Sequence, residues 1–148
     1  MSDCQITRVL IVDDERFMRS TVRQMLKVVG QFTVEEAADG AAALAAVASF
    51  KPDLVICDNG MAPMSGLEFL AKLRTHANEA LRSTRVLMLT GDAKEATLVG
   101  AARLQVSGYL VKPVSAKQLG ERMHALSKVK PGSASAYGTV SLPTTATP

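Results

Sequence analysis

Short apolar runs alternate with segments of helical period along most of the chain, and this alternation constrains the fold more than any other feature. The runs are too continuous for strands with one face in water, so each is expected to be buried on both faces. Buried strands separated by amphipathic helices are typical of a parallel sheet covered by helices on both sides. The sequence therefore predicts an α/β domain of five strand–helix units.

The five units can be placed along the chain. Strands are expected at residues 8–12, 32–37, 53–57, 86–90 and 109–111, and helices at 15–29, 41–49, from 65 through 73, 94–105 and 116–129. Gly30 is expected to end the first helix, and Pro52 to break the chain before the third strand. The segment 76–85 is polar and is predicted to be a loop.

A length of 148 residues suits one compact domain. We expect residues 1–129 to form it and residues 130–148, rich in Ser, Thr and Pro, to be a flexible tail, because this tail has too few apolar side chains to offset the entropy of ordering. No apolar run reaches the roughly 18 residues that a membrane span requires, and the first residues lack the pattern of a secretory signal. A soluble cytoplasmic protein without membrane insertion is expected.

The net charge of +3 is mild and spread along the chain, which argues against direct binding to DNA. Cys4 and Cys57 are the only cysteines, and their spacing predicts reduced thiols and no zinc site. One basic stripe occurs on the predicted first helix, at Arg16, Arg19, Arg23 and Lys27. It is either a solvated face or a surface for an acidic partner.

Polar side chains stand at four of the five predicted strand ends: Asp13 and Asp14, Asp58, Thr90 and Lys112. The carboxyl ends of the strands in an open parallel sheet lie along one edge, where ligands bind. Three carboxylates gathered there would repel one another unless a cation lay among them. Carboxylate oxygens suit Mg²⁺, so a magnesium site is expected at this edge.

The remaining strand-end groups suggest what the site would do. Lys112 and Thr90 would offer a cation and a hydroxyl donor to a tetrahedral anion, and Asp58 an oxygen nucleophile. These are the groups that phosphoryl transfer to a carboxylate requires. Taken alone, Asp13 and Asp14 could instead cap a helix, and Thr90 could be a turn hydroxyl.

Four motifs in a fixed order carry a family resemblance: VLIVDD at 9–14, D-x-x-M-x-x-M-x-G from Asp58 to Gly66, LMLTG at 87–91 and GYLVKP at 108–113. Together they resemble the receiver domain of two-component response regulators, and most closely the CheY-like single-domain regulators. The resemblance covers about residues 6–129. It implies a flavodoxin-like, doubly wound sheet with strand order 2-1-3-4-5.

The resemblance also implies residue roles. Asp58 would accept a phosphoryl group from a phosphohistidine. The magnesium ligands would be Asp13, Asp14, Asp58 and the carbonyl of Gly60, the phosphoryl contacts Thr90 and Lys112, and the switch residues Thr90 and Tyr109. A cis peptide bond would join Lys112 to Pro113.

The implied function is that of a stand-alone receiver in a phosphorelay, possessing no catalysis beyond its own phosphorylation and dephosphorylation. Its partners would be a sensor histidine kinase or histidine phosphotransfer protein and a downstream protein, such as a chemotaxis component, bound to the face made by the fourth helix, fifth strand and fifth helix. Two alternatives stay open: an aspartyl-phosphate-forming phosphatase and a non-phosphorylated scaffold. Phosphatases of the haloacid dehalogenase type carry a second Asp where this chain has Gly60.

The chain departs from the family pattern around the site. Ala62 stands where the family commonly has Pro, and Pro63 follows it. Gly60 and Asp92 occupy the two positions that influence attack of water on the acyl phosphate, with opposed expected effects. Gly91 replaces a frequent Ala, which should give the loop after the fourth strand more freedom.

Overall fold

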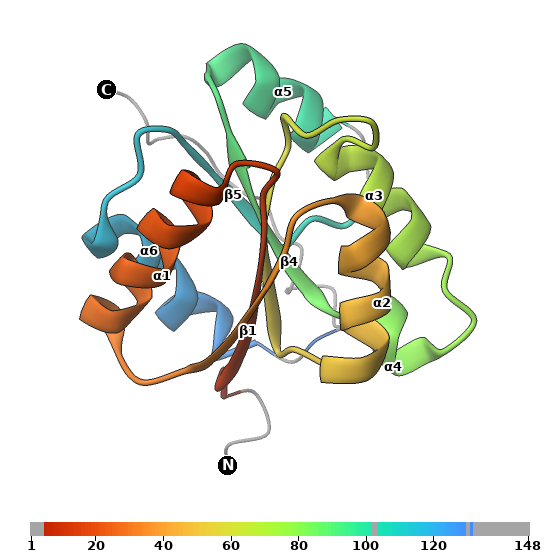
Figure 1. Ribbon diagram of the computed structural model, residues 1–148, viewed down its shortest axis with the longest axis horizontal. Helices are drawn as coiled ribbons and strands as arrows, with labels where there is room; N and C mark the ends of the chain where they lie inside the picture. The colour runs from red at the N-terminus through yellow and green to blue at the C-terminus, as the bar shows by residue number, and fades with distance from the viewer. Residues whose placement is uncertain (1–4, 102–103, 130, 132–148) are drawn as a thin grey trace.

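The computed structural model of the chain describes residues 5–101, 104–129 and 131. Its five parallel strands form one sheet in the order β2-β1-β3-β4-β5 (Figure 1). The strands are β1 (Arg8–Val12), β2 (Thr33–Ala37), β3 (Leu54–Asp58), β4 (Arg85–Thr90) and β5 (Gly108–Val111). The α/β class and the flavodoxin-like strand order are therefore confirmed.

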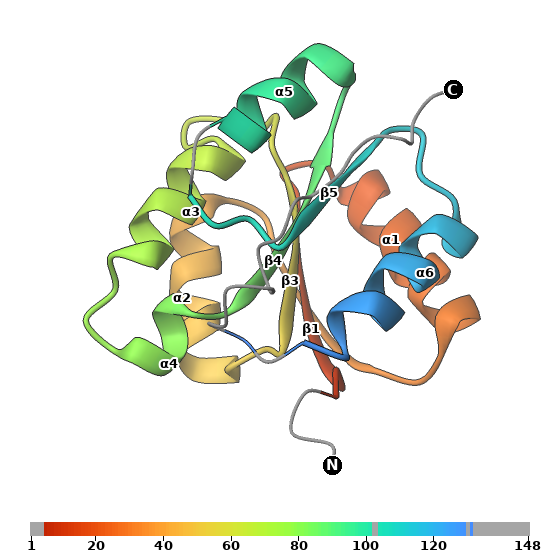
Figure 2. The same cartoon turned by 180° about the vertical axis from the view of Figure 1, so that it is seen from behind.

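Helices cover both faces of the sheet, as Figures 1 and 2 show from opposite sides. One face carries α1 (Arg16–Val29) and α6 (Ala116–Leu126), which lie side by side. The other carries α2 (Gly40–Phe50), α3 (Gly66–Arg74), the short α4 (Glu79–Arg82) and α5 (Ala93–Ala101). The sheet is thus the middle of three layers.

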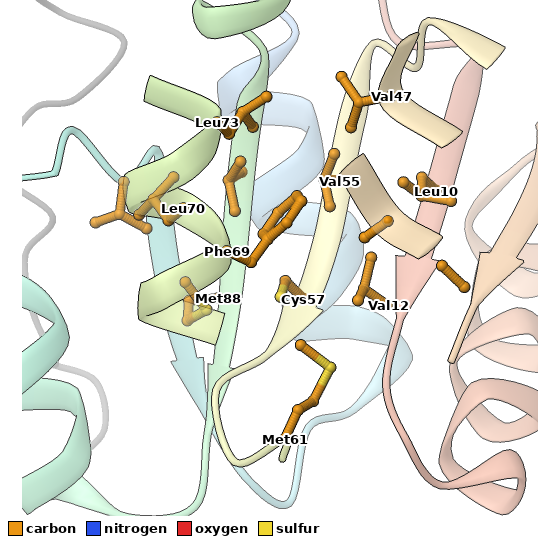
Figure 3. Packing of buried hydrophobic residues seen from close by; sticks show 14 of the residues in the cluster. Leu10, Val12, Val47, Val55, Cys57, Met61, Phe69, Leu70, Leu73 and Met88 are labelled. Carbon is orange, nitrogen blue, oxygen red and sulfur yellow. The ribbon is translucent and has the colours of Figure 1, made fainter. Parts of the chain in front are cut away.

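Successive side chains of the central strands enter two separate cores. In β3, Val55 and Cys57 belong to the core under α2 and α3, whereas Leu54 and Ile56 belong to the core under α1 and α6. Figure 3 shows the first of these cores, in which Phe69 of α3 packs near Val55 and Cys57. Because both faces are covered, the central strands β1 and β3 are apolar at nearly every position, whereas the edge strand β2 carries exposed glutamates.

Local sequence accounts for where several helices begin. Ser65 opens α3 with a capping box, in which its side chain accepts a hydrogen bond from the Glu68 N–H and the Glu68 side chain accepts one from the Ser65 N–H. Ser115 and Gln118 form the same arrangement at the start of α6. Asp39 caps α2 by accepting a hydrogen bond from the Ala42 N–H at 2.7 Å.

The prediction of a loop at residues 76–85 is wrong in two places. Residues Glu79–Arg82 form α4, capped by the Asn78 side chain, and Arg85 is the first residue of β4. Arg85 is only 1% exposed. Its guanidinium donates to the carbonyls of Asp53, Leu126 and Val129 at 3.1, 2.8 and 3.2 Å. These acceptors are distant in sequence, so local polarity does not reveal that the arginine is buried.

The other helix and strand bounds differ little from the predicted ones, except at the ends of the fourth and fifth predicted helices. The former was expected to reach Gln105, but α5 ends at Ala101, and Gln105 has a φ of 59°. The latter was expected to reach Val129, but α6 ends at Leu126. Cys4 and the predicted tail, apart from Pro131, lie outside the described residues. In the described part of the chain, no helix has the length and apolar character that crossing a membrane requires.

Candidate functional site

The carboxyl ends of four strands bring the sequence-predicted site residues to one edge of the sheet, near the start of α1 in Figure 1. Asp13 follows β1, Asp58 ends β3, Thr90 ends β4 and Lys112 follows β5. One side-chain oxygen from each of Asp13, Asp14 and Asp58 lies within 4.8 Å of the other two. The structure therefore assembles the predicted acidic cluster.

Asp13 is the most deeply buried carboxylate of the cluster, at 2% exposure. Its Oδ1 accepts a hydrogen bond from the Glu15 N–H at 2.8 Å, but its Oδ2 is buried without a hydrogen-bond partner. Burial raises the pKa of Asp13 to about 6, with the charge of Asp58 adding to the rise and the Glu15 N–H opposing it. A bound cation would give this buried, unpaired oxygen an electrostatic partner.

Asp58 is held from two sides. Its Oδ1 lies 2.7 Å from Lys112 Nζ, and its Oδ2 accepts a hydrogen bond from the Gly60 N–H at 3.2 Å. Burial opposes the charge on Lys112, but the hydrogen bond and negative charge of Asp58 outweigh it and raise the pKa of Lys112. Lys112 is therefore a charged partner. The backbone N–H of Lys112 donates to the Thr90 carbonyl at 2.8 Å, and this hydrogen bond joins the ends of β4 and β5.

Asp14 is exposed at the rim of the cluster, where its Oδ2 accepts a hydrogen bond from the Ala62 N–H at 3.4 Å. This contact joins the turn after β1 to the loop after β3. Neither Asp13 nor Asp14 is the N-cap of α1, because that position belongs to Glu15. The capping alternative therefore does not explain the two carboxylates.

The two residues named as a switch occupy different surroundings. Thr90 is fully buried, and the single proton of its hydroxyl has two acceptors within reach, the carbonyls of Asp92 and Leu110, both at 3.5 Å. Tyr109 is half-buried in β5 and packs against the core under α2 and α3. Burial raises the pKa of the Tyr109 hydroxyl, and the charge of Arg122 opposes this rise. Thr90 thus lies at the carboxyl edge of the sheet with the acidic cluster, whereas Tyr109 lies within β5, away from that edge.

The departures from the family pattern have structural counterparts. The Ala62–Pro63 peptide bond is cis, which the sequence analysis did not anticipate, and the expected cis bond between Lys112 and Pro113 is confirmed. Asp92 accepts a hydrogen bond from the Glu95 N–H at 2.9 Å. Its carboxylate is therefore engaged in the first turn of α5.

Sequence reasoning missed three residues that shape the site. Asn59 is buried; it donates to Glu95 Oε2 at 2.9 Å and accepts from the Leu67 N–H at 3.0 Å. Gly66 was named as the last residue of the motif that begins at Asp58 but was given no role at the site, yet a Cβ there would lie 2.7 Å from the carbonyl oxygen of Asp58. Adjacency to Asp58 was the only sequence signal for Asn59, and Glu95 had none.

The basic stripe on α1 is partly occupied within the protein. Arg19 and Arg23 donate to the two carboxylate oxygens of Glu36 at 3.0 and 2.7 Å, and these contacts lower the pKa of Glu36. Arg19 also donates to the Asp13 carbonyl at 2.8 Å. The middle of the stripe therefore ties α1 to β2 and to the acidic turn, and carries less free charge than the sequence suggests.

Comparison with known proteins gives a consistent assignment. The family model of the response regulator receiver domain matches residues 9–124. Chemotaxis protein CheY-3 of Vibrio cholerae is 38% identical over 116 residues, covering 78% of this chain and 88% of that protein. Chemotaxis protein CheY of Pseudomonas aeruginosa is 36% identical over 119 residues, covering 80% of this chain and 94% of that protein.

Solved structures agree in fold. The chemotaxis response regulator CheY4 of Vibrio cholerae superposes with a TM-score of 0.71 at 33% identity, covering 82% of this chain and 99% of that one. A putative response regulator from Chloroflexus aurantiacus gives a TM-score of 0.75 at 25% identity, covering 84% of this chain and all of that one. The similarity spans nearly the whole length of both neighbours.

Proposed function

Because the chain belongs to the response regulator receiver domain family, we propose that Asp58 accepts a phosphoryl group from a phosphohistidine on a sensor histidine kinase or histidine phosphotransfer protein. The observation that carries this proposal is the 2.7 Å contact between Asp58 Oδ1 and Lys112 Nζ beside two further carboxylates. A lysine fixed against the acceptor supplies positive charge where phosphoryl oxygens would arrive.

The donor set of the acidic cluster fits Mg²⁺. Its oxygens come from Asp13, Asp14 and Asp58, and the buried Asp13 Oδ2 has no hydrogen-bond partner, so a hard cation would satisfy it. The carbonyl of Gly60 is proposed as a further ligand. When bound, Mg²⁺ would offset the negative charge of the acceptor and of the phosphoryl oxygens.

The protein side chains would perform the remaining tasks. The Asp58 carboxylate forms a new oxygen–phosphorus bond while the nitrogen–phosphorus bond of the donor histidine breaks, and that histidine nitrogen leaves with the bonding electron pair. Lys112 orients Asp58 beforehand and then pairs with a phosphoryl oxygen. The Thr90 hydroxyl donates to another. Hydrolysis of the acyl phosphate by water completes the cycle, so the chain catalyses only its own modification.

The output is proposed to be a change of surface. The face that the sequence analysis assigned to the fourth helix, fifth strand and fifth helix is α5–β5–α6 in the structure, because the short α4 precedes β4. Thr90 ends β4, which lies next to this face, and Tyr109 lies in β5, which is part of it. Phosphorylation would bias the conformation of the face. A downstream protein in a chemotaxis-type pathway is the proposed target, in the cytoplasm and without direct DNA binding.

Intact mass spectrometry after incubation with Mg²⁺ and acetyl phosphate tests the proposal. We expect the wild type, and not Asp58→Asn, to gain the mass of one phosphoryl group, and EDTA to prevent the gain. Asp53→Asn is the matched control, because Asp53 lies at the opposite edge of the sheet and contacts Thr7. An adduct on Asp58→Asn, or none on the wild type, would contradict the proposal. Turnover of many small phosphate esters would instead favour the phosphatase alternative.

A further inference from the structure

The Glu95 carboxylate connects Asn59, which follows Asp58, to Gly91, which follows Thr90. Glu95, in the first turn of α5, accepts a hydrogen bond through Oε1 from the backbone N–H of Gly91, which follows Thr90. Through Oε2 it accepts one from the side-chain amide of Asn59, which follows Asp58, at 2.9 Å. Glu95 therefore ties the loop after β4 to the loop after β3.

The Asn59 end of this connection is firmly anchored. Asn59 is 9% exposed, and its side-chain carbonyl accepts a hydrogen bond from the Leu67 N–H at 3.0 Å. Its backbone N–H donates to Leu89 at 3.0 Å, and its backbone carbonyl accepts from Gly66 at 3.1 Å. Partners on α3 and β4 thus hold Asn59 on several sides. Glu95 consequently fastens the Gly91 amide to a fixed point.

The Thr90 hydroxyl, by contrast, is weakly held. It is fully buried, yet both of its acceptors, the carbonyls of Asp92 and Leu110, lie at 3.5 Å, the outer limit of a hydrogen bond. A phosphoryl group on Asp58 would bring charged oxygens to the adjacent strand end, and charged acceptors form stronger hydrogen bonds than neutral carbonyls. If the Thr90 backbone moved toward them, it would displace the Gly91 amide to which it is bonded.

We propose that Glu95, anchored by Asn59, is a positioning residue that retains the loop after β4 in its resting conformation and so opposes the movement of Thr90 toward a phosphoryl group. This inference rests on the proposed phosphorylation of Asp58. Gly91 contributes because a Cβ there would lie 3.1 Å from Glu95 Oε1, closer than most such contacts. Glycine at position 91 therefore lets the Glu95 carboxylate approach the backbone closely enough to accept a hydrogen bond from its N–H. That hydrogen bond restrains the loop after β4, which the conformational freedom of glycine would otherwise make more mobile.

The inference predicts that weakening this connection favours the phosphoryl-bound conformation. The probe is beryllofluoride with Mg²⁺, a stable mimic of a phosphoryl group on a carboxylate, titrated by calorimetry. For Glu95→Ala we expect the dissociation constant of beryllofluoride to fall about three- to tenfold, because the resting state loses hydrogen bonds to a charged acceptor. The dissociation constant of Mg²⁺ alone should not change.

Matched variants separate positioning from general stability. Glu79→Gln removes the same charge from an exposed side chain in the first turn of α4 and should bind beryllofluoride as the wild type does. Glu95→Gln keeps the shape but sets an amide against the Asn59 amide, so a smaller gain in affinity is expected. Gly91→Ala should shift affinity in the same direction by displacing the carboxylate.

The outcomes distinguish this inference from the proposed function. Unchanged or weaker beryllofluoride binding by folded Glu95→Ala and Glu95→Gln, with normal binding and phosphorylation of the wild type, would overturn the positioning role alone. Parallel changes in the affinities for Mg²⁺ and beryllofluoride would show a merely structural role and would also overturn it. A wild type that binds no beryllofluoride and gains no phosphoryl group would overturn the proposed function itself.

Discussion

Asp13 illustrates how a residue of the proposed metal site can oppose folding. Its carboxylate is buried with one oxygen unpaired, and its pKa is raised from 3.8 to about 6. A carboxyl whose pKa is higher in the folded state stabilises the fold fully below pH 3.8, and this stabilisation is lost as the pH rises through about 6. The metal-free protein should therefore lose stability across this interval.

For the metal-free wild type we expect the free energy of unfolding to fall by about 2 kcal/mol between pH 4 and pH 7 through this group. Asp13→Asn should remove that fall and be the more stable protein at pH 7. Urea unfolding in EDTA across this pH range measures both. Equal slopes for the two proteins would show that Asp13 does not titrate as its burial indicates.

Site residues that stand at the ends of strands could be predicted from the sequence. Asp13 follows β1 and Asp58 ends the adjacent β3, while Lys112 follows β5 on the far side of β4, so the topology alone brings all three to the carboxyl edge of the sheet. The Asn59–Glu95 contact depends instead on the path of two loops and on side-chain rotamers. No periodic pattern encodes either, and for this reason the sequence did not reveal it.

At the scale of single elements, Gly66 determines how closely α3 approaches the end of β3. A Cβ at this position would lie 2.7 Å from the Asp58 carbonyl oxygen, 2.8 Å from Asn59 Cα and 2.9 Å from Met88 Sδ. Two of these neighbours are backbone atoms that cannot turn away. Only glycine allows the helix to start this close to the end of β3, where Asp58 lies.

Gly66→Ala should therefore lower the free energy of unfolding by about 2–3 kcal/mol, the usual cost of forcing extra volume into a packed region. Gly30→Ala is the control, because its Cβ would meet only Phe32 ring atoms at 3.4 Å and its φ of 173° is open to any residue. Chemical denaturation of both variants measures the difference. Similar stabilities would mean that α3 can shift without loss.

The error at residues 76–85 shows what limits the prediction of elements. The segment is polar and was assigned to a loop, yet it contains α4 and the buried Arg85. Arg85 can be buried because its guanidinium donates to main-chain carbonyls just before β3 and at the end of α6. Burial of a charged side chain thus depends on acceptors that folding brings from far along the chain.

At the scale of the whole molecule, the two hydrophobic cores are built from residues between Ile6 and Leu126. The boundary predicted at residue 129 follows the last of these core residues. We expect a protein truncated after Pro131 to have a free energy of unfolding within about 0.5 kcal/mol of that of the full chain, because every side chain that the described residues contribute to the two cores is kept. Parallel urea titrations test this expectation. A loss of several kcal/mol would mean that the segment from residue 132 onward contributes to the fold.

The order of the strands required more than periodicity. Runs buried on both faces predicted a parallel sheet, but Val9 and Val55 would be equally apolar in any strand order. The order 2-1-3-4-5 came from the family resemblance and is the order observed. Hydrophobic pattern specifies how deeply a strand lies, whereas connections and packing decide which strand lies beside it.

The described chain begins and ends near the amino ends of the strands. The Thr7 N–H donates to Asp53, just before β3, and the Val129 carbonyl accepts from Arg85, which begins β4. The acidic cluster lies at the opposite, carboxyl edge of the sheet. A fluorescent reporter, affinity surface or fusion partner joined beside Thr7 or Val129 would therefore leave the edge that carries the acidic cluster open to the kinase proposed above.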